Sequence, residues 1–206
     1  MVKVTHLNIY TPTSQILRDI SFETGANLAI LGSSGSGKST LCRAFCGLLS
    51  PNLKISYGAL EVQGRAGYVF QDCISCFFPY LKILDTFKMV LKDKVDKALP
   101  IFESLNIPSK VWGLYPYELS RGMASRVQIA LNLTLEPQIL LLDEVTSSLD
   151  SVNTQSVVQL LLELNVQKIT ITHDEEVAYH LCEQVLVLEN GEMTYFGDKK
   201  GYFTWD

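Results

Sequence analysis

A glycine-rich segment between a predicted strand and a predicted helix constrains this chain more than any other feature. Residues 32–40 read Gly-Ser-Ser-Gly-Ser-Gly-Lys-Ser-Thr, after the apolar run 27–31 and before a helical pattern over 41–49. The pattern G-x-x-x-x-G-K-S in a strand–turn–helix context is typical of a phosphate-binding loop. Its glycines let successive backbone N–H groups converge on phosphate oxygens at a helix N-terminus. A Gly/Ser-rich surface turn is the alternative, but the flanking strand and helix favour a nucleoside triphosphate site.

Two side chains of this loop have a predicted role in phosphate chemistry. Lys38 can reach the β- and γ-phosphates, and the Ser39 hydroxyl is placed to ligate Mg²⁺. The other positions are expected to contribute mainly backbone donors. The predicted nucleotide-binding residues of the loop are Gly32, Ser33, Ser34, Gly35, Ser36, Gly37, Lys38, Ser39 and Thr40.

The order of the other predicted elements indicates an α/β fold. An apolar strand over 139–142 and strands over 168–172 and 184–188 alternate with helices over 151–164 and 174–182. A helix-rich insert over 81–136 is expected to be broken by its three prolines. We predict one domain over 1–206, a P-loop NTPase whose core comprises 1–80 and 137–206. Residues 81–136 form its inserted helical subdomain. The further strands expected over 2–10, 16–22, 59–62, 67–71 and 192–196 include a small antiparallel edge.

Composition and charge exclude several classes of protein. The 206 residues, 47% of them hydrophobic, can fill a sizeable core. The net charge of −5 argues against a nucleic-acid partner. No apolar run approaches the ~18 residues that span a bilayer, and the first residues alternate like a strand rather than a signal peptide. We therefore expect any contact with a membrane to come through a partner.

The five cysteines are expected to be reduced thiols. Cys73 and Cys76 have C-x-x-C spacing, but no second pair or histidine stands at metal-ligand spacing. Cys42 and Cys46 are four residues apart on a predicted helix, which suits small buried side chains. The pattern therefore favours a structural role over a metal or redox role.

A second chemical motif follows the apolar strand 139–142, where Asp143 and Glu144 stand in sequence. In a P-loop protein the carboxylate at the strand end holds the Mg²⁺ shell. The next carboxylate can orient and deprotonate an attacking water. An ordinary charged turn is the alternative for this pair alone, because many strands end in such turns. A phosphate loop upstream favours the catalytic interpretation.

The segment Leu-Ser-Arg-Gly-Met at 119–123 opens another predicted helix. Ser120 suits a helix N-cap, with Gly122 as a flexible neighbour. The same hydroxyl and the unpaired N–H groups of a helix start also make an anion site. The residues themselves leave both interpretations open.

Taken together, the motifs resemble the ATP-binding subunits of ATP-binding-cassette (ABC) transporters. The elements of that family appear in order at 32–40, 68–72, 119–123, 143–150 and 172–174. Within the family the chain is most similar to the ATPases of oligopeptide, dipeptide and nickel importers. The Phe-Gln-Asp sequence at 70–72 leading to Phe78-Pro79 and the methionine at Met123 carry this closer resemblance.

The resemblance implies roles for individual residues. Gln71 would complete the Mg²⁺ shell and report its occupancy to the membrane partner. Glu144 would be the catalytic base, and His173 would contact the γ-phosphate and hold Glu144 in place. Asp150 would bridge a dimer. Tyr10 would stack on adenine, although an ordinary strand aromatic is the alternative for it.

The resemblance also implies an activity and partners. The cofactors would be ATP and Mg²⁺, and two ATPases, either two copies or this chain with a paralogue, would close head to tail around ATP. Hydrolysis would drive uptake of a peptide or chelated nickel through a membrane permease. An extracytoplasmic solute-binding protein would contribute indirectly, and the chain would sit peripherally on the cytoplasmic face of the cell membrane. Another transport system, a non-transport ABC protein and a module that binds ATP without turnover are the alternatives.

Three features qualify these expectations. Arg121 replaces a glycine of the family motif, and Val145 replaces its usual proline after the catalytic glutamate. The long C-terminal extension of many peptide-importer ATPases is not expected. Apolar residues over 73–80, among them Phe77 and Phe78, are expected to dock a permease helix, and packing within the helical lobe is the alternative.

Overall fold

The computed structural model describes residues 1–147 and 149–204; Ser148, within the 143–150 motif, lies outside the described residues. Its central sheet has six strands in the order β10-β9-β3-β8-β7-β6. The strands β9, β3, β8, β7 and β6 are parallel, and β10 returns antiparallel to β9. Their bounds are Ala66–Val69 (β6), Ile139–Asp143 (β7), Gln167–Ile171 (β8), Leu28–Leu31 (β3), Gln184–Glu189 (β9) and Glu192–Asp198 (β10).

A second, antiparallel sheet contains the remaining described strands. β1 (Val2–Tyr10) pairs with β2 (Gln15–Thr24), β4 (Lys54–Ser56) and β5 (Ala59–Val62). Alternate residues of β1 are buried, and the alternation changes phase at His6, whose φ is 52°. The three residues of β4 are all exposed. That strand was not predicted, because it has no buried face to produce an apolar pattern.

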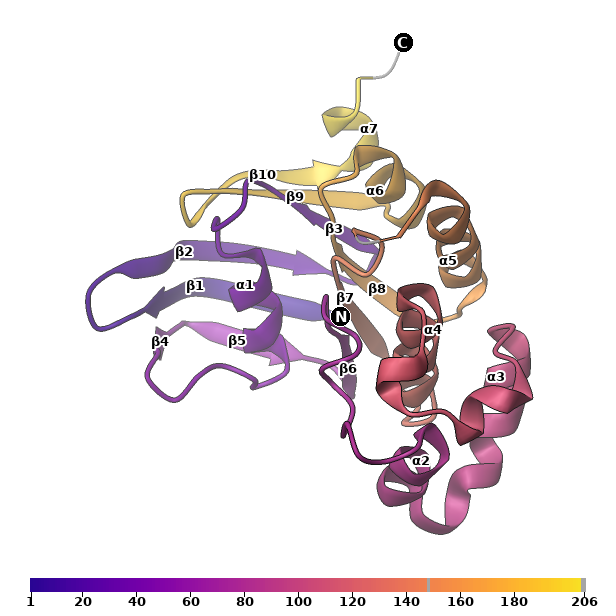
Figure 1. Ribbon diagram of the computed structural model, residues 1–206. Helices are drawn as coiled ribbons and strands as arrows, with labels where there is room; N and C mark the ends of the chain where they lie inside the picture. Colours follow the sequence, from indigo (N-terminus) through magenta and orange to yellow (C-terminus); the bar gives the residue numbers. More distant parts are fainter. Residues whose placement is uncertain (148, 205–206) are drawn as a thin grey trace.

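The helices lie around these sheets (Figure 1). In Figure 1 the antiparallel strands and the helices α2 to α4 form two arms, at the left and the lower right, on either side of the six-stranded sheet. The helices are α1 (Lys38–Phe45), α2 (Ile83–Leu91), α3 (Ala98–Ser104), α4 (Arg121–Leu133), α5 (Ser151–Glu163), α6 (Glu175–Leu181) and α7 (Lys199–Tyr202). Short 3₁₀ helices cover Lys92–Lys97, Ser109–Gly113 and Pro116–Glu118. The α/β class with an inserted run of helices is confirmed.

Two predictions about helices were wrong in detail. The helix expected over 41–49 starts at Lys38 and ends at Phe45, shortly before Gly47 with φ 66°. Pro100 does not break a helix, because it lies in the first turn of α3, where its missing N–H has no partner to lose. The helix α7 was not predicted.

Two apolar clusters fill the opposite faces of the six-stranded sheet, and β7 contributes to both. Ile139 and Leu141 join the cluster with α1 and the antiparallel strands, whereas Leu140 and Leu142 join the cluster with α2 to α5. Successive side chains of a strand point to opposite faces, so a fully buried parallel strand is apolar throughout. This explains the unbroken apolar run before Asp143.

None of the helices that the structure describes combines the length and the apolar character needed to cross a membrane.

Cys42 is buried as predicted, whereas Cys46 is half-buried and follows the end of α1.

Candidate active site

The phosphate-binding segment joins the end of β3 to the start of α1, as its sequence predicts. Gly32 has φ 139°, and a Cβ atom there would lie 2.1 Å from the Leu188 carbonyl oxygen. Gly37 is the N-cap of α1 with φ 103°, and a Cβ atom there would lie 2.5 Å from the Leu17 side chain. Both backbone conformations and both close approaches require glycine.

A cleft of about 460 Å³ opens over this segment. It lies where the carboxyl ends of parallel strands meet, the usual ligand position in open α/β sheets. Gln71 follows β6, Glu144 follows β7 and His173 follows β8. The lining residues are Ile16, Ser34, Gly35, Gly37, Lys38, Ser39, Thr40, Gln71, Glu144 and His173.

The Lys38 side chain is buried within the loop. Its Nζ donates to the carbonyl oxygens of Gly32 and Ser33, both at 2.8 Å. Burial lowers the pKa of Lys38 below its ordinary value, while the nearby carboxylates of Glu144 and Asp143 act in the opposite direction. A cation held this way at the mouth of a glycine-rich loop can bind phosphate oxygens.

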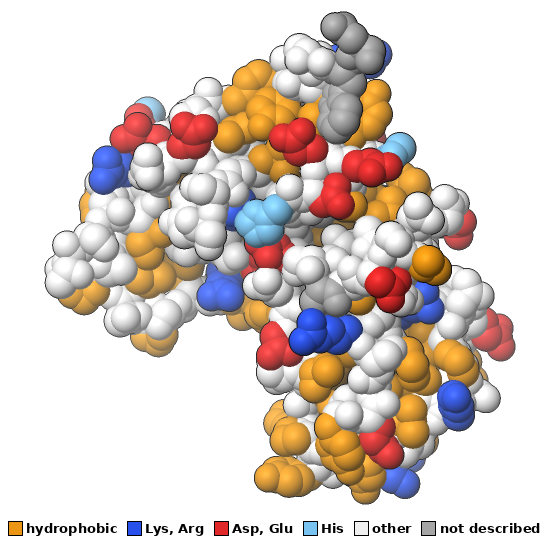
Figure 2. Space-filling view, turned by 45° about the horizontal axis from the view of Figure 1, so that its top comes forward, with side chains coloured by type: hydrophobic (Ala, Val, Ile, Leu, Met, Phe, Trp, Pro, Cys, Tyr) orange, Lys and Arg blue, Asp and Glu red, His pale blue; other side chains and the backbone are white. Residues whose placement is uncertain are grey.

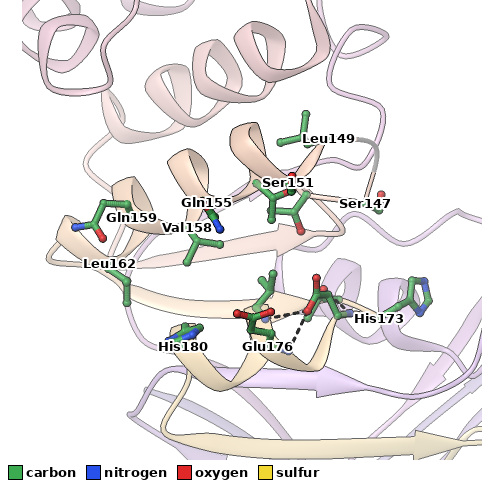
Figure 3. A pocket seen from close by; sticks show the side chains of 15 residues that line it. Ser147, Leu149, Ser151, Gln155, Val158, Gln159, Leu162, His173, Glu176 and His180 are labelled. Carbon is green, nitrogen blue, oxygen red and sulfur yellow. Dashed lines mark hydrogen bonds between the residues drawn. The ribbon is translucent and has the colours of Figure 1, made fainter.

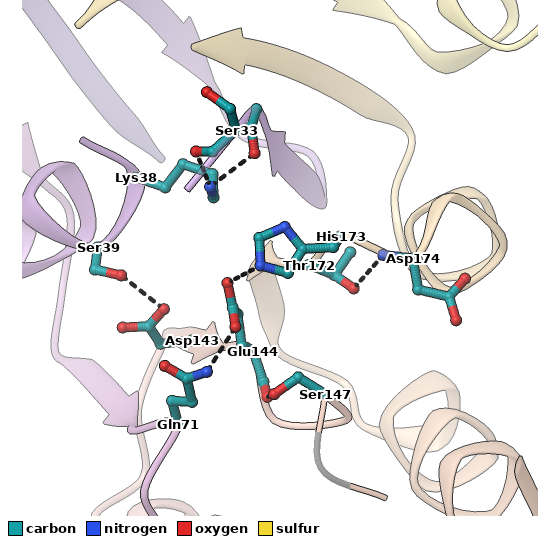
Figure 4. A network of polar contacts seen from close by, with 11 residues as sticks. Ser33, Lys38, Ser39, Gln71, Asp143, Glu144, Ser147, Thr172, His173 and Asp174 are labelled. Carbon is teal, nitrogen blue, oxygen red and sulfur yellow. Dashed lines mark hydrogen bonds and ion pairs between the residues drawn. The ribbon is translucent and has the colours of Figure 1, made fainter. Parts of the chain in front are cut away.

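Asp143 is the buried carboxylate of the site, 4% exposed. Its Oδ1 accepts a hydrogen bond from Ser39 Oγ at 2.9 Å, and its Oδ2 accepts one from the Tyr68 hydroxyl at 2.6 Å. Burial, followed by the bond to Asp143, raises the pKa of the Tyr68 phenol far above its ordinary range. Figure 4 shows the Ser39–Asp143 bond beside Lys38.

This donor set fits Mg²⁺ rather than a fully protein-bound metal. The described residues contain no group of three or more His, Cys, Asp or Glu side chains placed to hold a metal. Mg²⁺ is typically bound through one or two carboxylates together with substrate phosphates and waters. The adjacent Ser39 hydroxyl and Asp143 carboxylate are oxygen ligands of that type.

Glu144 lies at the centre of a second contact network. Its Oε2 accepts a hydrogen bond from Gln71 Nε2 at 2.7 Å, and its Oε1 is in direct polar contact with His173 Nε2 (Figure 4). The Glu144 side chain is 13% exposed and that of His173 49%. Glu144 has φ 51°, and its backbone N–H donates to the Ile171 carbonyl at 3.0 Å. Gln71 and His173, which are distant in sequence, therefore both contact the carboxylate of Glu144.

Other predicted site residues lie outside this cleft. Ser120 caps α4, its Oγ accepting from the Met123 backbone N–H at 3.3 Å. Gly122 is buried in the first turn of that helix, and Arg121 is exposed beside a smaller hollow of about 310 Å³. Asp150 caps α5, and its bonds to the Asn153 backbone and side chain lower the pKa of its carboxyl.

Tyr10 is not among the residues that line the cleft. It ends β1, paired with Gln15 on one side and Lys54 on the other. Its proposed stacking on adenine therefore remains a prediction.

A larger cleft of about 780 Å³ runs between α5 and α6 (Figure 3). His173 and His180 both line it, and Asp174 caps α6 by accepting from the backbone N–H groups of Glu176 and Val177. Two carboxylates and no lysine or arginine occur among its described lining residues. Such a lining repels a triphosphate, so the smaller cleft above the loop is the candidate nucleotide site.

Tyr68 and Asn132 also contribute to the site, although no role was predicted for either from the sequence. Tyr68 stands in an apolar strand, and a buried tyrosine hydroxyl usually requires a partner. The partner itself follows from strand register, since Tyr68 pairs with Leu141, two residues before Asp143. Asn132 lies on α4, and its amide bonds the backbone N–H and carbonyl of Tyr68.

Comparison with known families identifies the arrangement. The family model described as "ABC transporter" matches residues 17–147. The chain belongs to the ABC transporter family. It is 31% identical to the oligopeptide transport ATP-binding protein OppD of Haemophilus influenzae, over 98% of this chain and 73% of that protein. It is 34% identical to the metal-staphylopine import system ATP-binding protein CntF of Staphylococcus aureus, over 86% and 80%.

Solved structures agree with this assignment. A putative metal-chelate type ABC transporter in an inward-facing conformation superposes with a TM-score of 0.84 at 25% identity, over 98% of this chain and 85% of that chain. A dimeric, post-hydrolysis ATP-binding cassette bound to ADP and Pi gives a TM-score of 0.79 at 25% identity, over 96% and 98%. This ABC protein is therefore an ATP-binding subunit that resembles OppD and the dipeptide transport ATP-binding protein DppD, and it is an ATPase coupled to transport.

Proposed function

We propose that this ABC ATPase drives the import of a small solute, a peptide or a chelated metal such as nickel, through a separate membrane permease. The proposal is supported most directly by the double contact of Glu144 with Gln71 and His173 above the phosphate loop. In that position a carboxylate can orient and deprotonate a water next to a bound γ-phosphate.

The other residues of the cleft have complementary roles. Lys38 and the backbone of residues 32–40 would hold the triphosphate, and Ser39 and Asp143 would hold Mg²⁺, which neutralises phosphate charge. Gln71 would complete the Mg²⁺ shell. His173 holds Glu144 in one orientation, so that the base does not reorganise as charge develops.

The class of solute is inferred from relatives. Their names specify oligopeptide transport, methionine import and metal-staphylopine import. All are small solutes that carry amine and carboxylate groups or chelate a metal. The ATPase itself contacts the permease rather than the solute, so the permease and a solute-binding protein would select among these classes.

A surface for the permease follows the Gln71 segment. Phe78 is 54% exposed and Tyr80 91%, whereas Phe77 of the same predicted docking segment is 4% exposed and belongs to the core. Further exposed apolar side chains lie on α2, α3 and the 3₁₀ turn before α4, namely Met89, Val90, Leu99 and Tyr117. Figure 2 shows hydrophobic side chains gathered over the arm formed by α2 to α4. Exposed apolar patches of this kind are typical of partner sites, and a cytoplasmic permease helix would place the ATPase peripherally on that membrane face.

Dimerisation would complete the active site. Ser120 and Gly122 lie outside the cleft of their own chain and would face the nucleotide of a second ATPase, and Asp150 would bridge the two ATPases. That ATPase is either a copy of this chain or a paralogue. Arg121, which replaces a glycine, would then face the partner's nucleotide, so a heterodimer would have two unequal sites.

Glu144→Gln tests the assignment of the base. The amide keeps the size of the side chain but cannot accept the proton of water. We therefore expect an ATP affinity within about twofold of that of the wild type and ATP hydrolysis at least about 100-fold slower. Size exclusion should show an ATP-dependent dimer. Glu163→Gln, at the exposed end of α5, is the matched control and should hydrolyse ATP normally. Wild-type hydrolysis by Glu144→Gln would refute the assignment.

Transport itself needs a separate measurement. The ATPase is co-expressed with its genomically neighbouring permease and reconstituted in proteoliposomes, and ATP-dependent uptake of a peptide mixture and of chelated nickel is measured. Stable co-purification with uptake of either supports the proposal. Failure to associate with any permease would favour a non-transport ABC protein.

A further inference from the structure

We propose that Tyr68 is a positioning residue for the Mg²⁺ site, because its hydroxyl fixes the carboxylate of Asp143 in the orientation that meets Ser39. The inference rests on the proposed assignment of Ser39 and Asp143 to Mg²⁺. It concerns a residue that lies outside the phosphate loop and was not assigned a role by any motif.

The two oxygens of Asp143 have separate partners. Oδ2 is bonded to the Tyr68 hydroxyl at 2.6 Å and Oδ1 to Ser39 Oγ at 2.9 Å. Asp143 and Tyr68 are 4% and 6% exposed, so little water reaches either group. A buried carboxylate oxygen without a donor is costly, and the phenol supplies that donor.

Strand register brings the phenol to Asp143. The parallel strands β6 and β7 place Tyr68 opposite Leu141, and Asp143 follows two residues later on the same face. A tyrosine is long enough to reach this diagonal neighbour. The Tyr68 ring also packs on Phe70, with the ring centroids 4.5 Å apart.

The phenol acts as a donor here, because the carboxylate oxygen that it contacts is an acceptor. With Oδ2 bonded to the Tyr68 hydroxyl, Oδ1 remains directed at Ser39. Among the described residues no group of three or more His, Cys, Asp or Glu side chains could hold the cation, so the orientation of this one carboxylate has a large effect on its affinity.

The helix α4 fixes the other end of Tyr68. The strand β6 is at the edge of the sheet, so one side of its backbone has no neighbouring strand. Asn132 occupies that side: its Oδ1 accepts from the Tyr68 N–H at 3.0 Å, and its Nδ2 donates to the Tyr68 carbonyl at 3.2 Å. The Asn132 amide is itself held by a bond to the Gln128 carbonyl at 2.9 Å. Tyr68 is thus fixed at both its backbone and its hydroxyl.

Tyr68→Phe tests the proposal, because it removes the hydroxyl and keeps the ring. Binding of the β,γ-imido analogue of ATP is measured as a function of free Mg²⁺ and also in EDTA. We expect the half-saturating Mg²⁺ concentration to rise at least about tenfold, as is usual for loss of an outer partner of a metal ligand. Affinity in EDTA should change less than twofold. Tyr195→Phe is the control, since its hydroxyl bonds the Asp198 carbonyl at 2.9 Å, away from the cleft.

A purely structural role would lower the melting temperature and leave the Mg²⁺ dependence unchanged, and that result in folded Tyr68→Phe would overturn the inference. If wild type itself shows no Mg²⁺-dependent binding, the proposed function fails instead. If Tyr68→Phe does not fold, Asn132→Ala replaces it: a smaller rise in half-saturating Mg²⁺ supports the inference, and an unchanged value overturns it.

Discussion

At the scale of single residues, two buried lysines differ in their proposed roles: one binds phosphate and the other stabilises the fold. Lys38 and Lys168 are 5% and 4% exposed, and burial lowers the pKa of each. Lys38 Nζ bonds carbonyls of the phosphate loop, whereas Lys168 Nζ bonds the carbonyls of Leu164 and Val166 at 2.8 and 3.1 Å. Both lysines are buried with the ammonium group bonded to backbone carbonyls, but of the two only Lys38 lines the nucleotide cleft.

We therefore expect Lys38→Met to lower ATP affinity at least about thirtyfold, the range for removing one partner of a close charge pair. Lys168→Met should change the melting temperature but not the affinity. Isothermal titration with ATP and Mg²⁺ distinguishes the two variants. Equal affinity losses in both would show that the effect arises from altered folding rather than from a lost phosphate contact.

At the scale of elements, the start of α4 combines a structural and a proposed functional role in one hydroxyl. Ser120 is the N-cap of this helix, and the same hydroxyl is proposed to face a phosphate of the partner's nucleotide. Aspartate is as good an N-cap as serine, but its negative charge repels phosphate. Replacing one by the other therefore separates the two roles.

Ser120→Asp should keep the stability of the wild type and lose ATP hydrolysis, with ATP binding retained because the phosphate loop is untouched. Ser120→Ala should lower the free energy of unfolding by about 1 kcal/mol. Urea unfolding and steady-state hydrolysis measure the two effects. Normal hydrolysis by Ser120→Asp would mean that Ser120 is a helix cap and nothing more.

At the scale of the whole molecule, the segment that leads into the arm formed by α2 to α4 has a buried and an exposed aromatic residue side by side. Phe77 packs in the core with Phe87 and Phe102, and Phe78 projects to the surface. A permease helix that docks on this arm would bury Phe78. The adjacent pair therefore provides a test of coupling with an internal control for folding.

Phe78→Glu should leave the basal ATPase rate within about twofold and abolish ATP-dependent uptake in proteoliposomes, because a buried charge at an interface is unfavourable. Phe77→Glu should instead unfold the arm, since charges are not tolerated in a packed core. Uptake at the wild-type rate by Phe78→Glu would place the permease contact elsewhere.

Local patterns in the sequence were sufficient to predict the segments that carry the chemistry. The glycines of residues 32–40, the apolar strand before Asp143 and the cap at Ser120 each depend on neighbours a few residues away. Backbone conformation, strand burial and helix capping are set over such short ranges. The α/β class and the elements that carry the motifs could therefore be predicted from the sequence.

The contacts between these segments were decided by tertiary structure alone. The bond of Tyr68 to Asp143 depends on the register of β6 against β7, and the clamp of Asn132 on Tyr68 depends on how α4 crosses a sheet edge. The strand β4 forms only because it pairs with a free edge of β1. Each of these contacts joins residues far apart in the chain, and no periodicity or spacing encodes a register between two separate segments. The sequence by itself thus determined which residues are available for phosphate chemistry, and the packing of the strands determined which of them meet.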